Sequence, residues 1–260
     1  MRKSAAPRTE PAERLQKILA QLGLASRREA EAWIRAGRLT VNGAPATLGV
    51  RVRPADQLRL DGRVVRRHAA PQLRVFACHR SPGATLGRPQ EEGPGESAMA
   101  SRLPTRAGRR FIAVSPMPRI DGGLELLTSD GALALQLQRA AHRLESEFSV
   151  RVRGELTPEQ RSGILSGVLD RGTALVVERC ESAGGGGANC WYAVSARGGS
   201  GKDVRQLFER QAVLVSRVLR TRFGPVTLAR TLGRGQFREL TRAQTDALVA
   251  ALTDSRSSSP

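Results

Sequence analysis

The sequence has 260 residues, and its 42 lysines and arginines against 24 acidic residues give a formal net charge of +18. Only three of the basic residues are lysines, and the planar guanidinium of the others favours phosphate-bearing partners. Hydrophobic residues make up 40% of the chain, and no apolar run approaches the roughly 18 residues that cross a bilayer. We therefore exclude a disordered chain and expect a soluble protein of one large or two modest domains.

The three cysteines indicate neither a disulfide framework nor a zinc site. Cys78, Cys180 and Cys190 are an odd number and stand at no CxxC spacing. The first residues also lack the apolar stretch of a secretion signal. We expect a protein of a reduced compartment, the cytoplasm, that binds no membrane and no metal.

Positive charge is concentrated at the start of the chain. Residues 1–70 hold fifteen basic and six acidic residues, so just over a quarter of the chain carries half of the net charge. Residues 71–260 carry the rest of the charge more thinly and are interpreted as a larger, mixed α/β body. A stretch rich in Gly, Pro, Glu and Ser at residues 81–101 is predicted to be a mobile loop.

Two helices are predicted at the start of the basic segment. Apolar residues recur at the i, i+3, i+4, i+7 spacing at Leu15, Ile18, Leu19 and Leu22. Gly23 can end this first helix in the left-handed conformation. The segment Ser26–Glu29 has the form of a capping box, in which the serine and the glutamate satisfy amides at a helix start. A second helix therefore follows, with Ala30, Trp33 and Ile34 facing inward and Gly37 at its end.

A small sheet is predicted after these helices. Leu39–Val41 and Gln57–Leu60 have the composition of short strands, and Asn42-Gly43 is typical of a tight hairpin turn. Basic residues fall mostly outside the apolar stripe of the helices. We take these residues and the turn residue as candidate RNA contacts: Arg14, Lys17, Arg27, Arg28, Arg35, Arg38 and Asn42. The alternative is an ordinary solvated basic face.

The segment from Arg14 to Ile34, followed by Gly37–Gly43, closely resembles the S4 domain, an RNA-binding module. The resemblance extends over about residues 12–65 and implies recognition of structured RNA through its shape and phosphates.

The remainder of the chain resembles the bacterial ribosomal RNA pseudouridine synthases of the small-subunit and large-subunit uridine type. Similar segments occur in the family's order at 102–104, 111–114, 123–131, 147–152, 189–192, 202–207, 215–224 and 240–248. The resemblance implies an α+β fold, with a mixed, mainly antiparallel sheet flanked by helices and crossed by an RNA cleft. We expect a disordered basic start at 1–11, an S4-like domain at 12–70, a catalytic domain at 71–253 and a disordered tail at 254–260.

The family's chemistry depends on one aspartate, which attacks a uridine flipped out of its helix and uses no cofactor. In the family this aspartate ends a Gly-Arg-Leu-Asp segment. The same register here reads Ser115–Pro118, so Pro118 stands at the nucleophile position of an ungapped alignment. Proline has no group that can do this chemistry.

Arg119-Ile120-Asp121 repeats the family's triplet pattern three residues later. A locally shifted loop, aided by the glycines that follow, could bring Asp121 to the missing carboxylate's place. The alternative is that Asp121 only begins a turn before a strand at Leu124–Leu127. Asp130 is the weaker candidate nucleophile, because it matches a family residue that caps a helix.

Three further residues match family site positions. Arg205 matches the basic residue that pairs with the aspartate and orients it. Phe148 replaces a tyrosine that stacks on the flipped base, and Leu219 matches an apolar residue of the uracil pocket. Phe148 and Leu219 could equally be ordinary core residues. His79 has no fixed partner in the sequence pattern and is expected to be a surface or partly buried histidine.

Three functions remain open from the sequence. The first is a working RNA pseudouridine synthase, an isomerase, in which Asp121 attacks, Arg205 sets its ionisation and Phe148 stacks. The second is an inactive protein of the same fold that binds RNA during ribosome maturation, which Pro118 and the glycine-rich replacement at 198–202 favour. The third is a generic polyanion binder. A salt bridge between Asp121 and Arg205 would distinguish the first two. The partner is expected to be structured, ribosomal RNA, and the protein a monomer.

Overall fold

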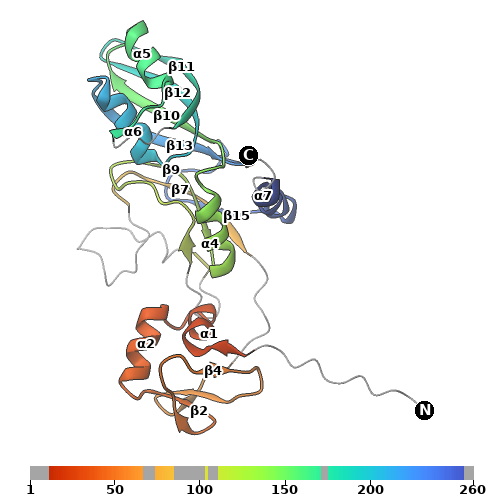
Figure 1. Cartoon of the computed structure of the whole chain (residues 1–260). Coiled ribbons are helices and arrows are strands. Elements are labelled where there is room, and N and C mark those ends of the chain that lie inside the picture. Colours follow the sequence, from red (N-terminus) through yellow and green to blue (C-terminus); the bar gives the residue numbers. More distant parts are fainter. Residues whose placement is uncertain (1–11, 67–73, 85–102, 105–110, 171–174, 255–260) are drawn as a thin grey trace. The chain divides into compact units, whose positions relative to one another are not determined.

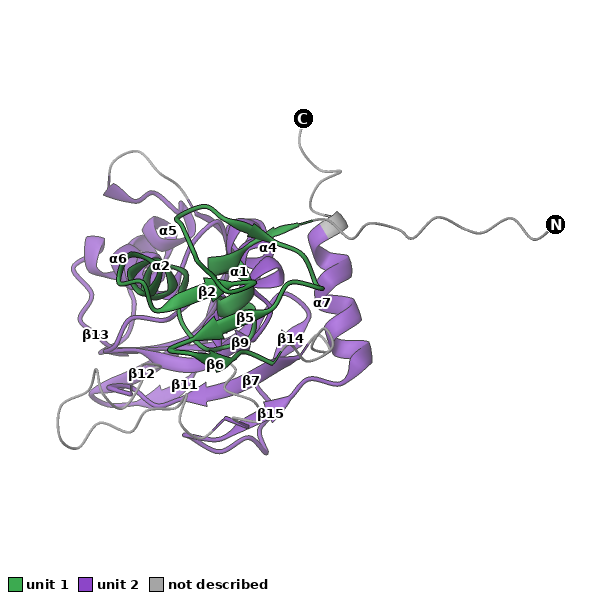
Figure 2. Cartoon of the chain, turned by 90° about the horizontal axis from the view of Figure 1, so that it is seen from below, with its two compact units in different colours: residues 1–72, 105–110 green, residues 73–104, 111–260 purple. Residues whose placement is uncertain are grey.

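The computed structural model describes residues 12–66, 74–84, 103–104, 111–170 and 175–254 (Figure 1). The chain divides into two compact units, one formed by residues 1–72 and 105–110 and the other by residues 73–104 and 111–260 (Figure 2). Most of the predicted mobile loop and both predicted disordered ends lie outside the described residues. Asp254, placed in the predicted tail, instead ends a helix.

The first unit consists of two helices and two small sheets. Its elements are β1 (Glu13–Arg14), α1 (Leu15–Gln21), α2 (Arg27–Arg35), β2 (Leu39–Val41), β3 (Ala44–Pro45), β4 (Arg51–Val52), β5 (Leu58–Leu60) and β6 (Arg63–Val64). The strands β3-β2-β5-β6 form one sheet in that order, and β1 pairs with β4. Buried apolar residues of both helices and of the sheet form one core, at Leu15, Leu19, Ala30, Ile34, Leu39, Val52 and Leu58.

The local signals in this unit act as the sequence predicts. Gly23 has a φ of 73°, which lets the chain leave α1. The Ser26 hydroxyl accepts a hydrogen bond from the amide of Glu29, whose carboxylate accepts one from the Ser26 amide. Asn42 and Gly43 both have positive φ, as the hairpin turn between β2 and β3 requires. Both predicted helices and the hairpin are confirmed.

The second unit is built on a nine-stranded sheet. Its elements are β7 (Val75–Arg80), β8 (Ile112–Ala113), β9 (Gly122–Thr128), α4 (Gly131–Ala140), β10 (Ser146–Arg153), α5 (Pro158–Leu165), β11 (Val176–Gly186), β12 (Asn189–Arg197), α6 (Gly201–Arg210), β13 (Val215–Phe223), β14 (Val226–Thr227), β15 (Phe237–Glu239) and α7 (Arg242–Asp254). The strand order is β11-β12-β10-β13-β9-β7-β15, with β14 on β13 and β8 on β9.

One strand pair differs from the rest of this sheet. β13 and β9 run parallel and pair only at Leu219 with Gly122 and at Arg220 with Gly123, whereas the other pairs are antiparallel. The two strands are not paired before Gly122. Asp121, the residue that precedes Gly122 in the chain, therefore lies beside the unpaired part of β13.

Helices cover the sheet with apolar residues. Side chains of α5 and α6 pack with every second residue of β10 and with Val218 of β13 in one core. Helices α4 and α7 pack on β9 and the end of β13 in a second core. Asp130 caps α4 by accepting hydrogen bonds from the amides of Ala132 and Leu133, as predicted. The predicted α+β architecture is confirmed.

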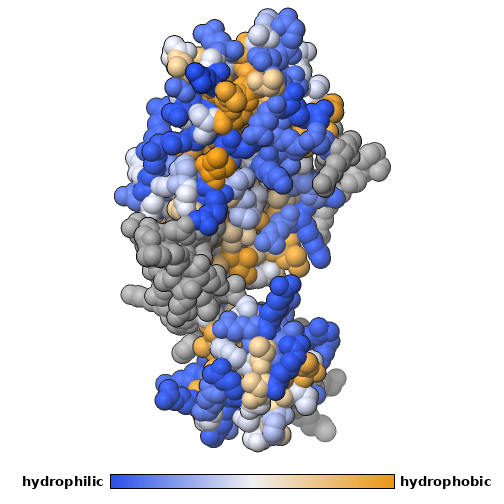
Figure 3. All heavy atoms as spheres, turned by 90° about the vertical axis from the view of Figure 1, so that its left-hand side faces the viewer, coloured by the Kyte–Doolittle hydropathy of each residue, from blue (hydrophilic) through white to orange (hydrophobic). Residues whose placement is uncertain are grey.

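Few large apolar side chains are exposed, and the face seen in Figure 3 is mainly hydrophilic with scattered apolar residues. Within the described residues, no helix is long and apolar enough to cross a membrane.

Candidate active site

The carboxylate of Asp121 lies at the point where β9 and β13 separate, and it is fully buried. Arg205 on α6 donates two hydrogen bonds to it, from Nε to Oδ2 at 3.2 Å and from Nη2 to Oδ1. The backbone amide of Val218 donates a third, to Oδ1 at 2.9 Å. These three donors fix the orientation of the carboxylate. Asp121 and Arg205 thus form the salt bridge that the synthase hypothesis requires.

Two glycines let the chain reach this position. A Cβ on Gly122 would lie 2.5 Å from the carbonyl oxygen of Arg80, and one on Gly123 would lie 2.3 Å from that of Arg220. Gly123 also has a φ of 94°. Only residues without a side chain fit between β7 and β13 here, so the glycine pair brings Asp121 against Val218.

Asp121 also takes part in the turn that the sequence suggested. Its backbone amide donates to the carbonyl of Pro118 at 3.0 Å, which closes a turn before β9. The backbone of Asp121 therefore serves a turn while its side chain faces Arg205.

A buried ion pair holds the loop that precedes Asp121. Nε of Arg80 lies 2.7 Å from Oε1 of Glu125, and both side chains are almost fully buried. Nη2 of Arg80 donates to the carbonyls of Met117 at 2.9 Å and Pro118 at 2.6 Å. Oε1 of Glu125 accepts from the amide of Met117 at 2.9 Å. The loop backbone is thus fixed by two charged groups from β7 and β9.

A second buried arginine anchors the start of the same loop. Arg220 on β13 donates to the carbonyl of Ser115 at 2.7 Å and to that of Leu124 at 2.8 Å. Burial lowers the pKa of Arg220 to about 10, while the nearby carboxylate of Glu125 opposes that shift. Arg220 is therefore still charged at neutral pH.

Arg205 reaches Asp121 from the first turns of α6. The helix begins with a capping box between Ser200 and Asp203, within the glycine-rich segment that replaces charged residues of the family. Arg205 is 13% exposed and donates a further bond to the carbonyl of Val215 at 2.9 Å. Hydrogen bonding to Asp121 raises the pKa of Arg205, against the opposing effect of burial.

A hollow of about 820 Å³ runs along α6 and has Arg205 in its wall. Its other lining residues are Leu169, Asp170, Lys202, Asp203, Gln206, Glu209 and Arg210. Arg205 therefore connects the buried carboxylate to a polar surface depression.

The structure places the two predicted pocket residues on opposite faces of the sheet. Phe148 lies directly opposite Arg220, whereas its neighbour Ser149 lies opposite Leu219, so Phe148 and Leu219 point to different sides. Phe148 is 2% exposed and shares a core with Met117 and Val218. On the face of Phe148, β13 contributes Val218 and Arg220. Phe148 and Leu219 therefore do not line one pocket in this structure.

Sequence reasoning missed four contributors to the site, namely the amide of Val218 and the side chains of Arg80, Glu125 and Arg220. The amide of Val218 has no sequence signal, because any residue carries one. Glu125 does have a signal, since it is a charged residue between two leucines of a strand. Arg80 and Arg220 have at least one polar neighbour in the sequence and so give no such signal. His79 bonds through Nδ1 to the carbonyl of Leu232 at 2.8 Å, as expected of a partly buried structural histidine.

The candidate RNA contacts of the first unit fall into two groups. The residues of the first group already have partners within the unit: Lys17 pairs with Glu13 and Arg38 pairs with Asp61. The side chain of Asn42 donates to the carboxylate of Asp56 and accepts from the backbone amide of Gln57. The exposed residues of the second group make no ion pair within the described part of the chain; they are Arg14, Arg27, Arg28 and Arg35.

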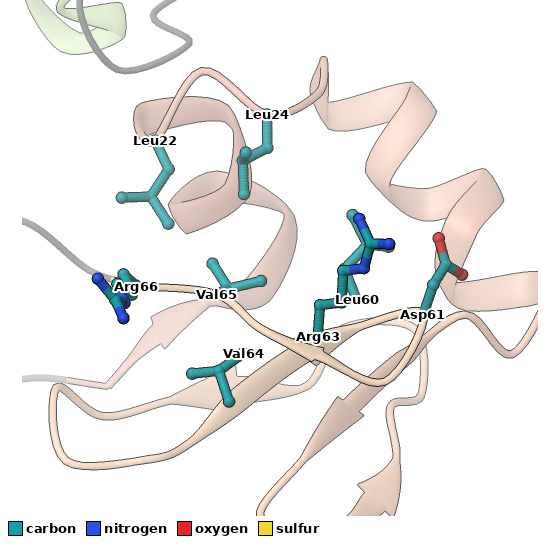
Figure 4. A pocket seen from close by; sticks show the side chains of 8 residues that line it. All are labelled: Leu22, Leu24, Leu60, Asp61, Arg63, Val64, Val65 and Arg66. Atoms are coloured by element: carbon teal, nitrogen blue, oxygen red, sulfur yellow. The ribbon is translucent and has the colours of Figure 1, made fainter.

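The first unit also has a hollow of about 700 Å³ (Figure 4). It is lined by Leu22, Leu24, Leu60, Asp61, Arg63, Val64, Val65 and Arg66. Within the described residues, no group of three or more His, Cys, Asp or Glu side chains could hold a metal ion.

Comparisons with known proteins agree with these observations. The family model of the S4 domain matches residues 13–58. Ribosomal large subunit pseudouridine synthase B of Pseudomonas aeruginosa is 39% identical over 245 residues, which are 93% of this chain and 63% of the relative. The protein of the same name from Salmonella typhimurium is 39% identical over 240 residues, which are 91% of this chain and 82% of the relative.

A solved structure has the same fold. A crystal structure of a pseudouridylate synthase superposes with a TM-score of 0.57 at 19% identity, covering 91% of this chain and 99% of that one. This chain spans 63% of the length of the Pseudomonas relative, so that protein has a part with no counterpart here.

Proposed function

Because the chain belongs to the ribosomal large subunit pseudouridine synthase B family, we propose that it isomerises a uridine of large-subunit ribosomal RNA with Asp121 as the nucleophile. The observation that carries the proposal is the buried pair of Asp121 and Arg205 where β9 and β13 separate. It supplies a carboxylate and its cationic partner although Pro118 stands at the family's aspartate position in an ungapped alignment.

The reaction needs one nucleophile and proton transfers. The bond between N1 and C1′ of the uridine breaks, the base turns, and a bond between C5 and C1′ forms. C5 loses one proton and N1 gains one, so product and substrate have the same atoms. Asp121 attacks and is released in this sequence, while Arg205 and the amide of Val218 hold the carboxylate in one orientation.

The site has to open for the substrate. The Asp121 carboxylate has no exposed surface, so a uridine reaches it only if neighbouring residues move. The target base must also leave its stack, because its reacting atoms are inaccessible in a helix.

The first unit binds the same RNA. Its S4 domain supports RNA binding. The contacts that we propose are four arginines without an ion pair among the described residues: Arg14, Arg27, Arg28 and Arg35. We further propose residues 12–70 as the RNA-binding domain, residues 71–253 as the catalytic domain, and a monomer that acts in the cytoplasm, where ribosomal RNA is modified.

A second function has specific support. Pro118 at the family's nucleophile position and the complete burial of Asp121 favour an inactive protein that binds ribosomal RNA. The experiment that separates the two is incubation of the full chain with transcribed large-subunit ribosomal RNA, followed by carbodiimide treatment and primer extension. A new stop at one uridine supports the synthase. Tight, salt-sensitive binding without any stop contradicts it and supports the inactive protein.

A further inference from the structure

The sheet of the second unit has a face that points away from α5 and α6. Val150 and Val152 of β10 pack in the core with those helices, so Arg151 between them points to the other side. Trp191 of β12 and Arg217 of β13 lie directly opposite Arg151 on the two neighbouring strands. The three side chains therefore form a row across three strands on one face.

The two arginines of this row are an unfavourable pair. Like charges at directly opposite positions of an antiparallel pair destabilise a sheet. Nε of Arg151 donates to the hydroxyl of Ser216 at 2.8 Å, and its guanidinium lies 5.9 Å from the ring centre of Trp191. Within the described residues, neither Arg151 nor Arg217 has a carboxylate at salt-bridge distance.

Farther along the same face the charges are balanced. Glu147, four residues before Arg151 on β10, pairs with Arg179 at 3.2 Å and with Arg222 at 3.0 Å. The face thus has a neutralised end and a basic end. At one end, the carboxylate of Glu147 neutralises neighbouring arginines. At the other end, Arg151 and Arg217 can bind an anion of a ligand.

We propose that Arg151 and Arg217 bind backbone phosphates of the RNA substrate, with Trp191 holding Arg151 in place. Leu219, two residues after Arg217 on the same face, pairs with Gly122, the residue after Asp121. The row therefore lies on the same sheet as the turn that carries Asp121, on the face that points away from α6. Guanidinium groups match phosphate oxygens in charge and in hydrogen-bond geometry.

A neighbouring hollow has polar side chains that suit a nucleotide of the same RNA. Ser216, which accepts the bond from Arg151, also lines a hollow of about 340 Å³ together with Arg153 and Asn189. Their polar groups could contact a nucleotide next to the bound phosphates. This inference rests on the proposed function for its substrate, but it concerns binding and not the attack by Asp121.

The test measures how salt weakens binding of the full chain to transcribed large-subunit ribosomal RNA. Arg151→Gln and Arg217→Gln are compared with Arg179→Gln, a control on the same face whose charge is already paired. Each of the first two should reduce the slope of log affinity against log salt by about one phosphate contact. Arg151→Lys should restore most of the slope, because it keeps the charge but not the bond to Ser216. Arg179→Gln should leave the slope unchanged.

The measurement is made in the Asp121→Asn background, so its outcome does not depend on catalysis. An unchanged slope in the Arg151→Gln, Arg217→Gln double variant overturns the proposal. A reduction of the same size in Arg179→Gln overturns it as well, since net charge alone would then explain the effect. A failure of the proposed function would instead appear as absence of pseudouridine with the wild-type chain, while RNA binding at this face stays intact.

Discussion

The guanidinium of Arg205 and the carboxylate of Asp121 meet through two hydrogen bonds, although 84 positions separate them in the sequence. Helix α6 supplies one partner and the turn before β9 supplies the other. Because the pair is largely withdrawn from water, loss of either partner leaves a buried charge without compensation.

Arg205→Gln should therefore lower the free energy of unfolding by about 3–5 kcal/mol and remove pseudouridine formation. Arg205→Lys keeps the charge but not the forked geometry, so it should keep more stability than activity. Urea unfolding and the rate of modification on ribosomal RNA measure the two effects. Full activity of Arg205→Gln would show that the pair does not belong to the catalytic site.

The buried pair of Arg80 and Glu125 permits a separate test of the loop before Asp121. Glu125→Gln alone should destabilise the protein by about 3–5 kcal/mol, because it leaves Arg80 buried without its carboxylate. The double variant Arg80→Met, Glu125→Leu should recover only part of that stability, because it also removes the carboxylate near the buried Arg220 and the donors to the carbonyls of Met117 and Pro118.

The same double variant should stay slow in catalysis. It removes the donors that hold the carbonyls of Met117 and Pro118, so the loop is no longer fixed beside Asp121. Modification rates are compared at matched stability, at a temperature well below each midpoint. A double variant that is both stable and fully active would contradict a positioning role for the pair.

Stability in acid should depend on Glu145. The hydrogen bond from Ser195, followed by the charge of Arg222, lowers the pKa of Glu145 below its ordinary value. A carboxyl group with a lowered pKa in the folded state stabilises that state above its unfolded pKa of about 4.5 and loses the contribution as the pH falls further.

The free energy of unfolding should accordingly fall below about pH 4.5, and Glu145→Gln should make that fall shallower. Ser195→Ala removes the first cause of the shift and should act in the same direction. Denaturant titrations between pH 3 and 7 provide the measurement. Identical pH profiles for the wild type and Glu145→Gln would remove this group from the acid sensitivity.

The S4 domain offers a matched pair of charge variants. Arg27 and Arg28 are exposed at the start of α2, whereas Arg38 is paired with Asp61. Replacing Arg27 and Arg28 by alanine should reduce the salt slope of RNA binding by about one contact each, and Arg38→Gln should change it less. Equal effects of all three substitutions would contradict the division into paired and available arginines.

Local signals predicted the first unit well, because its helix ends and its hairpin depend on residues close in sequence. The capping box at Ser26 and the turn at Asn42 are examples. The ordered motifs also predicted the sheet of the second unit and the pairing of Asp121 with Arg205. Both of these follow from the family resemblance and not from local propensity.

Two features of the site could not be predicted in this way. Leu219 faces away from Phe148 because the register pairs Phe148 with Arg220 and Ser149 with Leu219, and this register depends on tertiary packing. The buried side chains of Arg80 and Glu125 come together from different strands to hold the loop before Asp121. Their charges were visible in the sequence, but their pairing depends on the register of β7 and β9.

The claim that Asp121 replaces the family's aspartate is tested most directly by one measurement. Pseudouridine formation on large-subunit ribosomal RNA is mapped for the wild type, for Asp121→Asn and for Asp130→Asn as a carboxylate control that only caps α4. We predict a carbodiimide stop with the wild type and with Asp130→Asn, and none with Asp121→Asn, while RNA binding stays nearly intact. A stop of undiminished strength with Asp121→Asn would contradict the account.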